Sequence, residues 1–171
     1  FVTSFVAKYI GPENFGKLTF ASSIFAIIQT IAMFGSENII FQKTAKDRRL
    51  GEYIIDSTKI IRDFMYVSLS LLTLVYIYFV ADQLTFIFSV ATSIAIYFAV
   101  HDLYIIYFNA ILQSKVNAYC NIFALIISLF VRYCIAEFQL AVELLSVPII
   151  LITLVPFVIR KYIFNKVKFK K

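Results

Sequence analysis

One apolar stretch of the chain carries polar or small side chains along a single face of its predicted helix. The members of this stripe recur at intervals of three or four positions and are Asn117, Asn121, Ala124, Ser128 and Arg132. Amide, hydroxyl and guanidinium groups are costly in hydrocarbon, so this face should contact protein or water. The chemistry that it offers is recognition of a polar or anionic solute, with Arg132 as the anion contact.

Arg132 also has a purely structural interpretation. It lies roughly 21 Å from the inner end of its helix, where an unpaired guanidinium costs about 2.5–3.5 kcal/mol. Its side chain can extend to the outer headgroups or pair with Glu137. We favour a cavity-lining role, because the other members of the stripe are polar or small along its whole length.

Two further groups of polar residues occur in apolar stretches. The first is a stripe that we expect to serve helix packing, with cavity lining as the alternative: Thr19, Ser22, Ser23, Ala26, Gln29, Thr30 and Met33. The second is the pair of His101 and Asp102, which offers a proton relay in a coupled transporter. We expect instead an interfacial pair near cytoplasmic water, since a single His without a second ligand forms neither a metal site nor a catalytic dyad.

Motifs typical of enzymes and metal proteins are missing from the sequence. It has no CxxC, HExxH, P-loop or GxSxG pattern. Cys120 and Cys134 lie roughly 21 Å apart on one predicted helix, beyond the reach of about 7 Å that a disulfide allows, so we expect free, buried thiols. The sequence therefore predicts no enzyme activity and no bound metal or cofactor.

Composition places the chain in a membrane. Hydrophobic residues make up 61% of the sequence and the mean hydropathy is +0.87, against roughly 45–50% apolar residues in soluble domains. The net charge of +6 does not indicate nucleic-acid binding, because the basic residues stand in blocks beside apolar segments, where they interact with lipid headgroups.

Charged residues divide the chain into six predicted spans of an all-α, polytopic membrane helix bundle. The spans are 1–10 (truncated), 18–41, 64–81, 84–112, 118–136 and 140–159, and the cytoplasmic loops are 42–63, 113–117 and 160–171. Gly11–Gly16 is the predicted turn between the first two spans, and 51–63 has the spacing of an amphipathic interfacial helix. Pro148 and Pro156 should bend the last span. Because both ends look truncated, we expect a fragment of a longer protein.

The basic residues orient this bundle. If the loop 42–63 is cytoplasmic, thirteen of the sixteen basic residues lie on that side: Lys43, Lys46, Arg48, Arg49, Lys59, Arg62, Lys115, Arg160, Lys161, Lys166, Lys168, Lys170 and Lys171. Lys8 and Lys17 fall at the outer side, and Arg132 falls inside a span. The opposite topology would violate the positive-inside bias.

Several segments resemble one transporter family. Ala7–Leu18 reads AKYIGPENFGKL and is followed by Met33-Phe34-Gly35 and by Gln42–Asp47, and a later segment, Tyr107–Lys115, reads YFNAILQSK. Their order resembles the N-terminal signature of Wzx-type polysaccharide flippases, in the multidrug/oligosaccharidyl-lipid/polysaccharide exporter superfamily. The resemblance covers all 171 residues as roughly the first half of a protein with about twelve spans.

The resemblance implies one lobe of a two-lobe carrier that flips undecaprenyl-diphosphate-linked oligosaccharide repeat units across the bacterial inner membrane by alternating access. Partners would be the lipid-linked substrate, membrane lipids, a polysaccharide polymerase and a chain-length regulator. Arg132 would contact the diphosphate or an acidic sugar, and sugar hydroxyls would be bound by Gln29, Asn121 and Ser128.

Two alternatives stay open. A multidrug or cation exporter of the same superfamily predicts more acidic residues in the cavity, whereas Asp102 is the only carboxylate well inside an apolar stretch. A membrane polymerase or ligase for glycans predicts a large outer loop carrying catalytic Arg or His, and no outer loop here is that long.

Overall fold

The structure, a computed structural model, describes residues 2–168, with side chains from Lys8 onward. In this part of the chain all regular structure is helical: α1 Val2–Met33, α2 Ser36–Lys46, α3 Arg48–Ser57, α4 Lys59–Val80, α5 Gln83–His101, α6 Tyr104–Ala110, α7 Ser114–Glu137, the short 3-10 helix η1 Val142–Leu145 and α8 Ser146–Lys168. Among the described residues, five segments are long and apolar enough to cross a bilayer: Lys8–Met33, Arg48–Val80, Gln83–Ala110, Ser114–Glu137 and Val142–Lys168. The predicted all-α, polytopic membrane helix bundle is confirmed.

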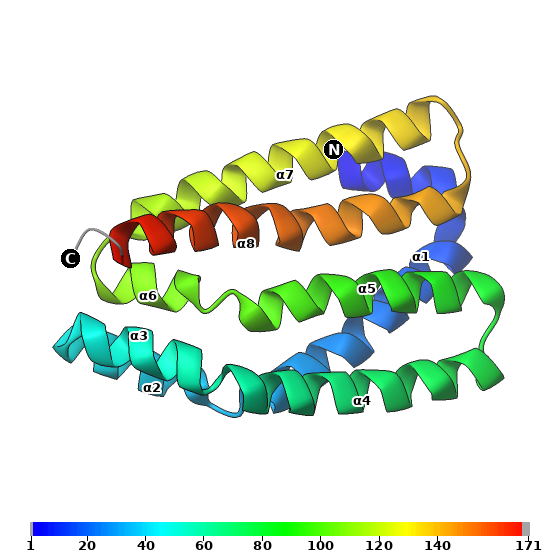
Figure 1. Ribbon diagram of the computed structural model, residues 1–171. Coiled ribbons are helices and arrows are strands. Elements are labelled where there is room, and N and C mark those ends of the chain that lie inside the picture. Colours follow the sequence, from blue (N-terminus) through cyan, green and yellow to red (C-terminus); the bar gives the residue numbers. More distant parts are fainter. Residues whose placement is uncertain (1, 169–171) are drawn as a thin grey trace.

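The long helices lie side by side and alternate in direction along the chain (Figure 1). Helix α5 packs against α1, α4 and α8, and α8 also packs along α7. The main core brings together buried aromatic and aliphatic side chains from α1, α4, α5, α6 and α8: Phe25, Tyr66, Val100, Phe108 and Phe164. Many large apolar side chains on the outside are exposed, as expected for a surface that contacts lipid.

Helix α1 is broken at one residue. Gly11 has φ 77° and ψ 163°, a conformation that glycine adopts without steric cost, and Pro12 follows as a favourable first residue of the next helical segment. Figure 1 shows the two segments of α1 running in different directions. The predicted turn over Gly11–Gly16 is thus reduced to Gly11, and residues 12–16 are helical.

The predicted loop 42–63 is almost entirely helical. The span predicted at 18–41 ends at Met33, because Phe34 and Gly35 both have positive φ angles, 45° and 67°. The chain then forms a helical hairpin of α2 and α3. Asp47 lies between them and caps α3, since its side chain accepts a hydrogen bond of 2.9 Å from the Arg49 amide.

Three other boundaries differ from the prediction. The stretch 84–112 is interrupted after His101, so that it forms α5 and the short α6. The loop 113–117 is shortened, because α7 begins at Ser114. The predicted loop 160–171 is helical up to Lys168, because α8 continues to that residue and buries Phe164 in the core. Residues 169–171 of this predicted loop lie outside the described residues. Pro148 lies in the first turn of α8, where its missing N–H costs no helix hydrogen bond.

One end of the bundle is strongly basic. Helices α2, α3 and α6 lie at this end, together with the beginnings of α4 and α7 and the end of α8 (Figure 1). These elements carry eleven of the thirteen basic residues predicted to share one side, all except Lys170 and Lys171, which lie outside the described residues. The fold therefore gathers this charge at a single end.

An ion-pair cluster joins helices at the opposite end. Lys17 of α1 lies 2.9 Å from Glu13 and 2.9 Å from Asp82, which sits between α4 and α5. The Asp82 carboxylate also accepts a hydrogen bond of 2.6 Å from the Thr85 hydroxyl. The Thr85 hydrogen bond, followed by the one from Lys17, holds the pKa of Asp82 below its usual value of 3.8.

A substitution at Gly51 tests how closely α2 and α3 pack in the helical hairpin. A Cβ atom added at Gly51 would lie 2.1 Å from Oγ1 and 3.0 Å from Cα of Thr44, so Gly51→Ala must push the two helices apart. We expect it to lower the free energy of unfolding by about 1–3 kcal/mol, measured by thermal unfolding in detergent. The control is Gly16→Ala, whose Cβ meets nothing within 4 Å and which should be neutral or stabilising by up to about 1 kcal/mol. Equal effects of the two substitutions would contradict this packing.

The ion-pair cluster predicts a pH dependence. Because the pKa of Asp82 is lower in the folded protein than in the unfolded chain, its stabilisation is present above the unfolded pKa and is lost as the pH falls through the folded one. Asp82→Asn should therefore reduce the unfolding temperature at pH 7, and this difference should shrink toward pH 3. A difference between the two proteins that stays constant across this range would show that the carboxylate charge is not involved.

Candidate functional site

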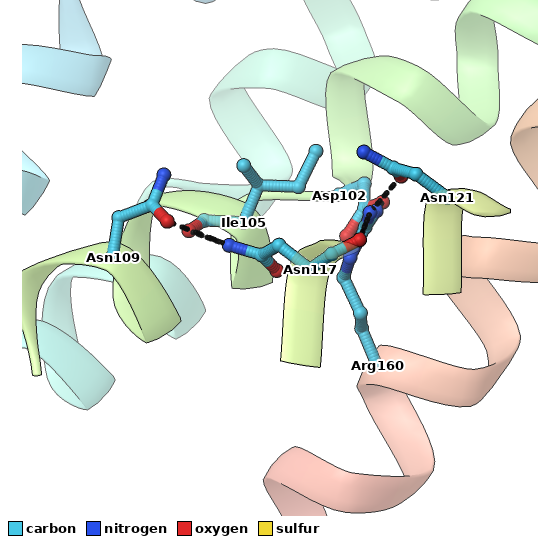
Figure 2. Close-up of polar contacts among 6 residues, drawn as sticks. All are labelled: Asp102, Ile105, Asn109, Asn117, Asn121 and Arg160. Carbon is cyan, nitrogen blue, oxygen red and sulfur yellow. Dashed lines mark hydrogen bonds and ion pairs between the residues drawn. The ribbon is translucent and has the colours of Figure 1, made fainter. Parts of the chain in front are cut away.

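A buried ion pair lies at the centre of the candidate site. Arg160 of α8 is 1% exposed and pairs with Asp102, which is 6% exposed. The guanidinium also donates a hydrogen bond to the Asn121 side-chain oxygen and a longer one, 3.5 Å, to the Asn117 carbonyl. Figure 2 shows the Arg160 side chain reaching from α8 to Asp102 and Asn121. Through these contacts Arg160 links α8 to the end of α5 and to α7.

Breaks in the helices position these groups. Asp102 follows the last residue of α5 and has non-helical angles, φ −83° and ψ 50°. Its side chain therefore does not follow the helical spacing of α5. Asn117 near the start of α7 donates hydrogen bonds of 2.9 Å to the Ile105 carbonyl and to the Asn109 side-chain oxygen. These two bonds fix α6 against α7, as the dashed lines in Figure 2 show.

The ion pair borders a polar cavity of about 450 Å³. Its walls come from six helices, α1, α2, α5, α6, α7 and α8, and its polar lining residues are Gln29, Glu37, Asp102, Asn109, Asn121, Thr153 and Arg160. Two buried atoms of the pair have no hydrogen-bond partner among the described residues: Oδ1 of Asp102 and Nε of Arg160. Since buried polar atoms are normally hydrogen-bonded, these atoms mark the wall as a place for water or a polar solute.

The cavity brings together three of the candidate binding and coupling residues predicted from the sequence. Gln29, Asn121 and Asp102 come from α1, α7 and the α5–α6 break, and all three line it. Ser128 does not, because it is 1% exposed and donates a hydrogen bond of 3.0 Å to the Pro148 carbonyl, which ties α7 to α8. The roles of all these residues in binding stay predictions.

Arg132 lies elsewhere. It is half-buried on α7 and does not line the cavity. Within the described side chains it forms no hydrogen bond or ion pair, so the alternative of a pair with Glu137 is not observed there. The cation at the cavity is Arg160.

His101 and Asp102 do not pair with one another. His101 is 8% exposed and faces α4, where its Nε2 lies 2.7 Å from Asp63 Oδ1 in an ion-pair contact that lacks hydrogen-bond alignment. Its Nδ1 lies 2.8 Å from the Tyr97 carbonyl. Both ring nitrogens of His101 thus lie near oxygen atoms, one on α4 and one on α5. The two residues belong to separate clusters.

The second polar stripe faces outward. Ser22, Ser23 and Thr30 are exposed, and their hydroxyls donate hydrogen bonds of 2.9–3.0 Å to carbonyls four residues earlier in α1. Only Gln29 and Met33 of this stripe line the cavity. The opposite face, with Phe25 and Ala32, packs into the core.

The Arg160–Asp102 ion pair predicts how substitutions change the free energy of unfolding. Asp102→Ala leaves a buried guanidinium without its counter-ion and should cost about 3–5 kcal/mol of unfolding free energy. Asp102→Asn/Arg160→Gln removes both charges and keeps uncharged polar side chains, and it should recover most of that loss. Lys166→Gln, at an exposed position on α8, is the control and should change stability by less than about 0.5 kcal/mol. Additive losses in unfolding experiments would mean that the two side chains do not interact.

No protein-family model, curated protein or solved structure matches the chain. The resemblance to polysaccharide flippases therefore stays a prediction. The function has to be argued from the cavity and from its place in a membrane helix bundle.

Proposed function

We propose that the complete protein containing this chain flips undecaprenyl-diphosphate-linked oligosaccharides across the bacterial inner membrane. The observation that carries the proposal is the Arg160 guanidinium, buried at a polar cavity inside an apolar helix bundle. Ionisable groups buried inside a membrane helix bundle are rare and mark the paths of polar solutes. A diphosphate with several sugars needs a polar, cationic cavity, while its prenyl chain can stay in lipid.

The contacts suggest how the cavity would act. Without substrate, Asp102 is the counter-ion of Arg160 and keeps the guanidinium from being buried unpaired. A diphosphate oxygen would replace Asp102 at the guanidinium, and the released carboxylate would take a proton or another cation. Arg160 is therefore our candidate for the anion contact, while Asn121 and Gln29 are placed for sugar hydroxyls.

The distribution of charge and polarity supports this arrangement. The basic end fits the cytoplasmic side under the positive-inside bias, which would make the cavity accessible to a substrate synthesised there. The exposed hydroxyl stripe of α1 fits a second lobe of the carrier or a water-filled space better than lipid. In this proposal the chain is one of two lobes, and a glycan polymerase and a chain-length regulator act on the flipped product.

A cation exporter is the second candidate. It is favoured by the carboxylate of Asp102, whose Oδ1 is buried without a hydrogen-bond partner, and by Glu37 in the same cavity. Under this alternative, Asp102 would bind the cargo and Arg160 would only position it. The two candidates therefore differ in which member of the ion pair is essential.

The test is complementation by the complete gene product in a bacterial strain that lacks its flippase, with surface glycan as the readout. We expect Asp102→Asn/Arg160→Gln to reach the membrane at normal amounts and to lower surface glycan about tenfold or more, because the anion contact is gone. Lys166→Gln is the control and should leave surface glycan unchanged.

Each other result has a defined meaning. Normal surface glycan in the double variant would refute the role of Arg160. Loss of glycan in Arg132→Ala alone would move the anion contact to Arg132, as the sequence predicted. Loss of drug resistance in Asp102→Asn, with normal glycan, would favour the exporter.

A further inference from the structure

A second polar cavity, of about 190 Å³, lies at the basic end of the bundle. It is bordered by α3, the start of α4, the end of α5 with His101, the start of α6 and the end of α8. Four lysine and arginine side chains line it, whereas its lining has one carboxylate: Lys59, Arg62, Lys161 and Lys168 against Asp56. The proposed cargo site does not include any of these residues.

Arg62 is the deepest cation of this cavity. It is 4% exposed, and its guanidinium donates hydrogen bonds to the Thr58 hydroxyl and, at 3.2 Å, to the Ile55 carbonyl. Both acceptors are neutral, and Nε has no partner among the described residues. The neighbouring carboxylate of Asp63 contacts His101 and Tyr97 instead. A buried guanidinium without a paired carboxylate is costly, which indicates an incomplete anion site.

The remaining side chains leave that site open. Asp56 is already engaged by Lys168 at 2.8 Å. Lys59 and Lys161 are exposed at the rim, and the Lys161 ammonium lies 5.6 Å from the centre of the Phe157 ring. Neither lysine forms an ion pair within the described residues, so both ammonium groups are available to an incoming anion.

We propose that this cavity binds a phosphate group, carried by an anionic lipid headgroup or by a soluble phosphate ester. A phosphate offers several acceptor oxygens, enough for the Arg62 guanidinium and for two ammonium groups. The cavity lies where α4 and α8 meet the basic end, the depth at which basic pockets between membrane helices contact headgroups. The proposal is independent of what the larger cavity transports.

The test measures binding of short-chain lipids to the complete, detergent-purified protein by calorimetry. Dioctanoyl phosphatidic acid and dioctanoylglycerol differ by the phosphate alone, and we expect binding of the phosphatidic acid only. Lys59→Gln/Lys161→Gln should weaken that binding about tenfold or more. The matched control, Lys43→Gln/Lys46→Gln, removes the same charge from exposed residues of α2 at the same end and should change binding less than about twofold.

Binding of inorganic phosphate distinguishes a phosphate carried by a lipid headgroup from one carried by a soluble phosphate ester. If it binds as tightly as phosphatidic acid, the site takes soluble phosphates; if it binds far more weakly, the site takes a lipid headgroup. Equal weakening by the two double variants would show unspecific attraction to the basic end and overturn the proposal. Equal binding of dioctanoylglycerol, or no binding of either phosphate probe, would overturn it as well.

Discussion

The ion pair between Arg160 and Asp102 is the constraint on which the arrangement of the other helices depends. An arginine cannot lose its charge in a protein, so burying it inside an apolar bundle requires a carboxylate and further acceptors. The interruption between α5 and α6 brings Asp102 to that position, and α7 supplies Asn121 as an acceptor. The cavity lies beside this junction of the α5–α6 interruption, α7 and α8, and Asp102, Asn121 and Arg160 form part of its wall.

The membrane explains why the two ends of the bundle differ. Apolar side chains cover the outside of the long helices, so charged residues collect where the helices end. At one end Lys17 pairs with two carboxylates, Glu13 and Asp82, so this cluster has one excess negative charge. At the other end cations exceed carboxylates, and part of this excess, at Arg62, is buried. This asymmetry favours one orientation in a membrane and concentrates positive charge at one end.

Hydropathy sufficed to predict the helical class and the existence of the long spans, because long apolar runs have few other solutions in lipid. It failed where charged residues were taken as span ends. Arg160 was placed in a loop, although α8 continues for two more turns to Lys168. One signal was available: Asp102 in an apolar stretch needs a cation, and Arg160 lies one residue beyond the predicted span. The α7 stripe was predicted as a face that contacts protein or water, but periodicity alone could not separate Ser128, in a helix contact, from Asn121, at the cavity.

The two buried arginines show how the same side chain serves different chemistry. Arg160 has a carboxylate and an amide oxygen as partners, so an anion that reaches it must compete with Asp102, and binding there is coupled to the fate of that carboxylate. Arg62 donates only to neutral oxygens, so an anion that reaches it meets no resident competitor. An anion that has to displace a resident carboxylate can be displaced by it in turn, which suits a cargo that must be released. A guanidinium without a carboxylate partner suits a ligand that stays bound. Under the two proposals, this difference assigns transport to the larger cavity and lasting anion binding to the basic end.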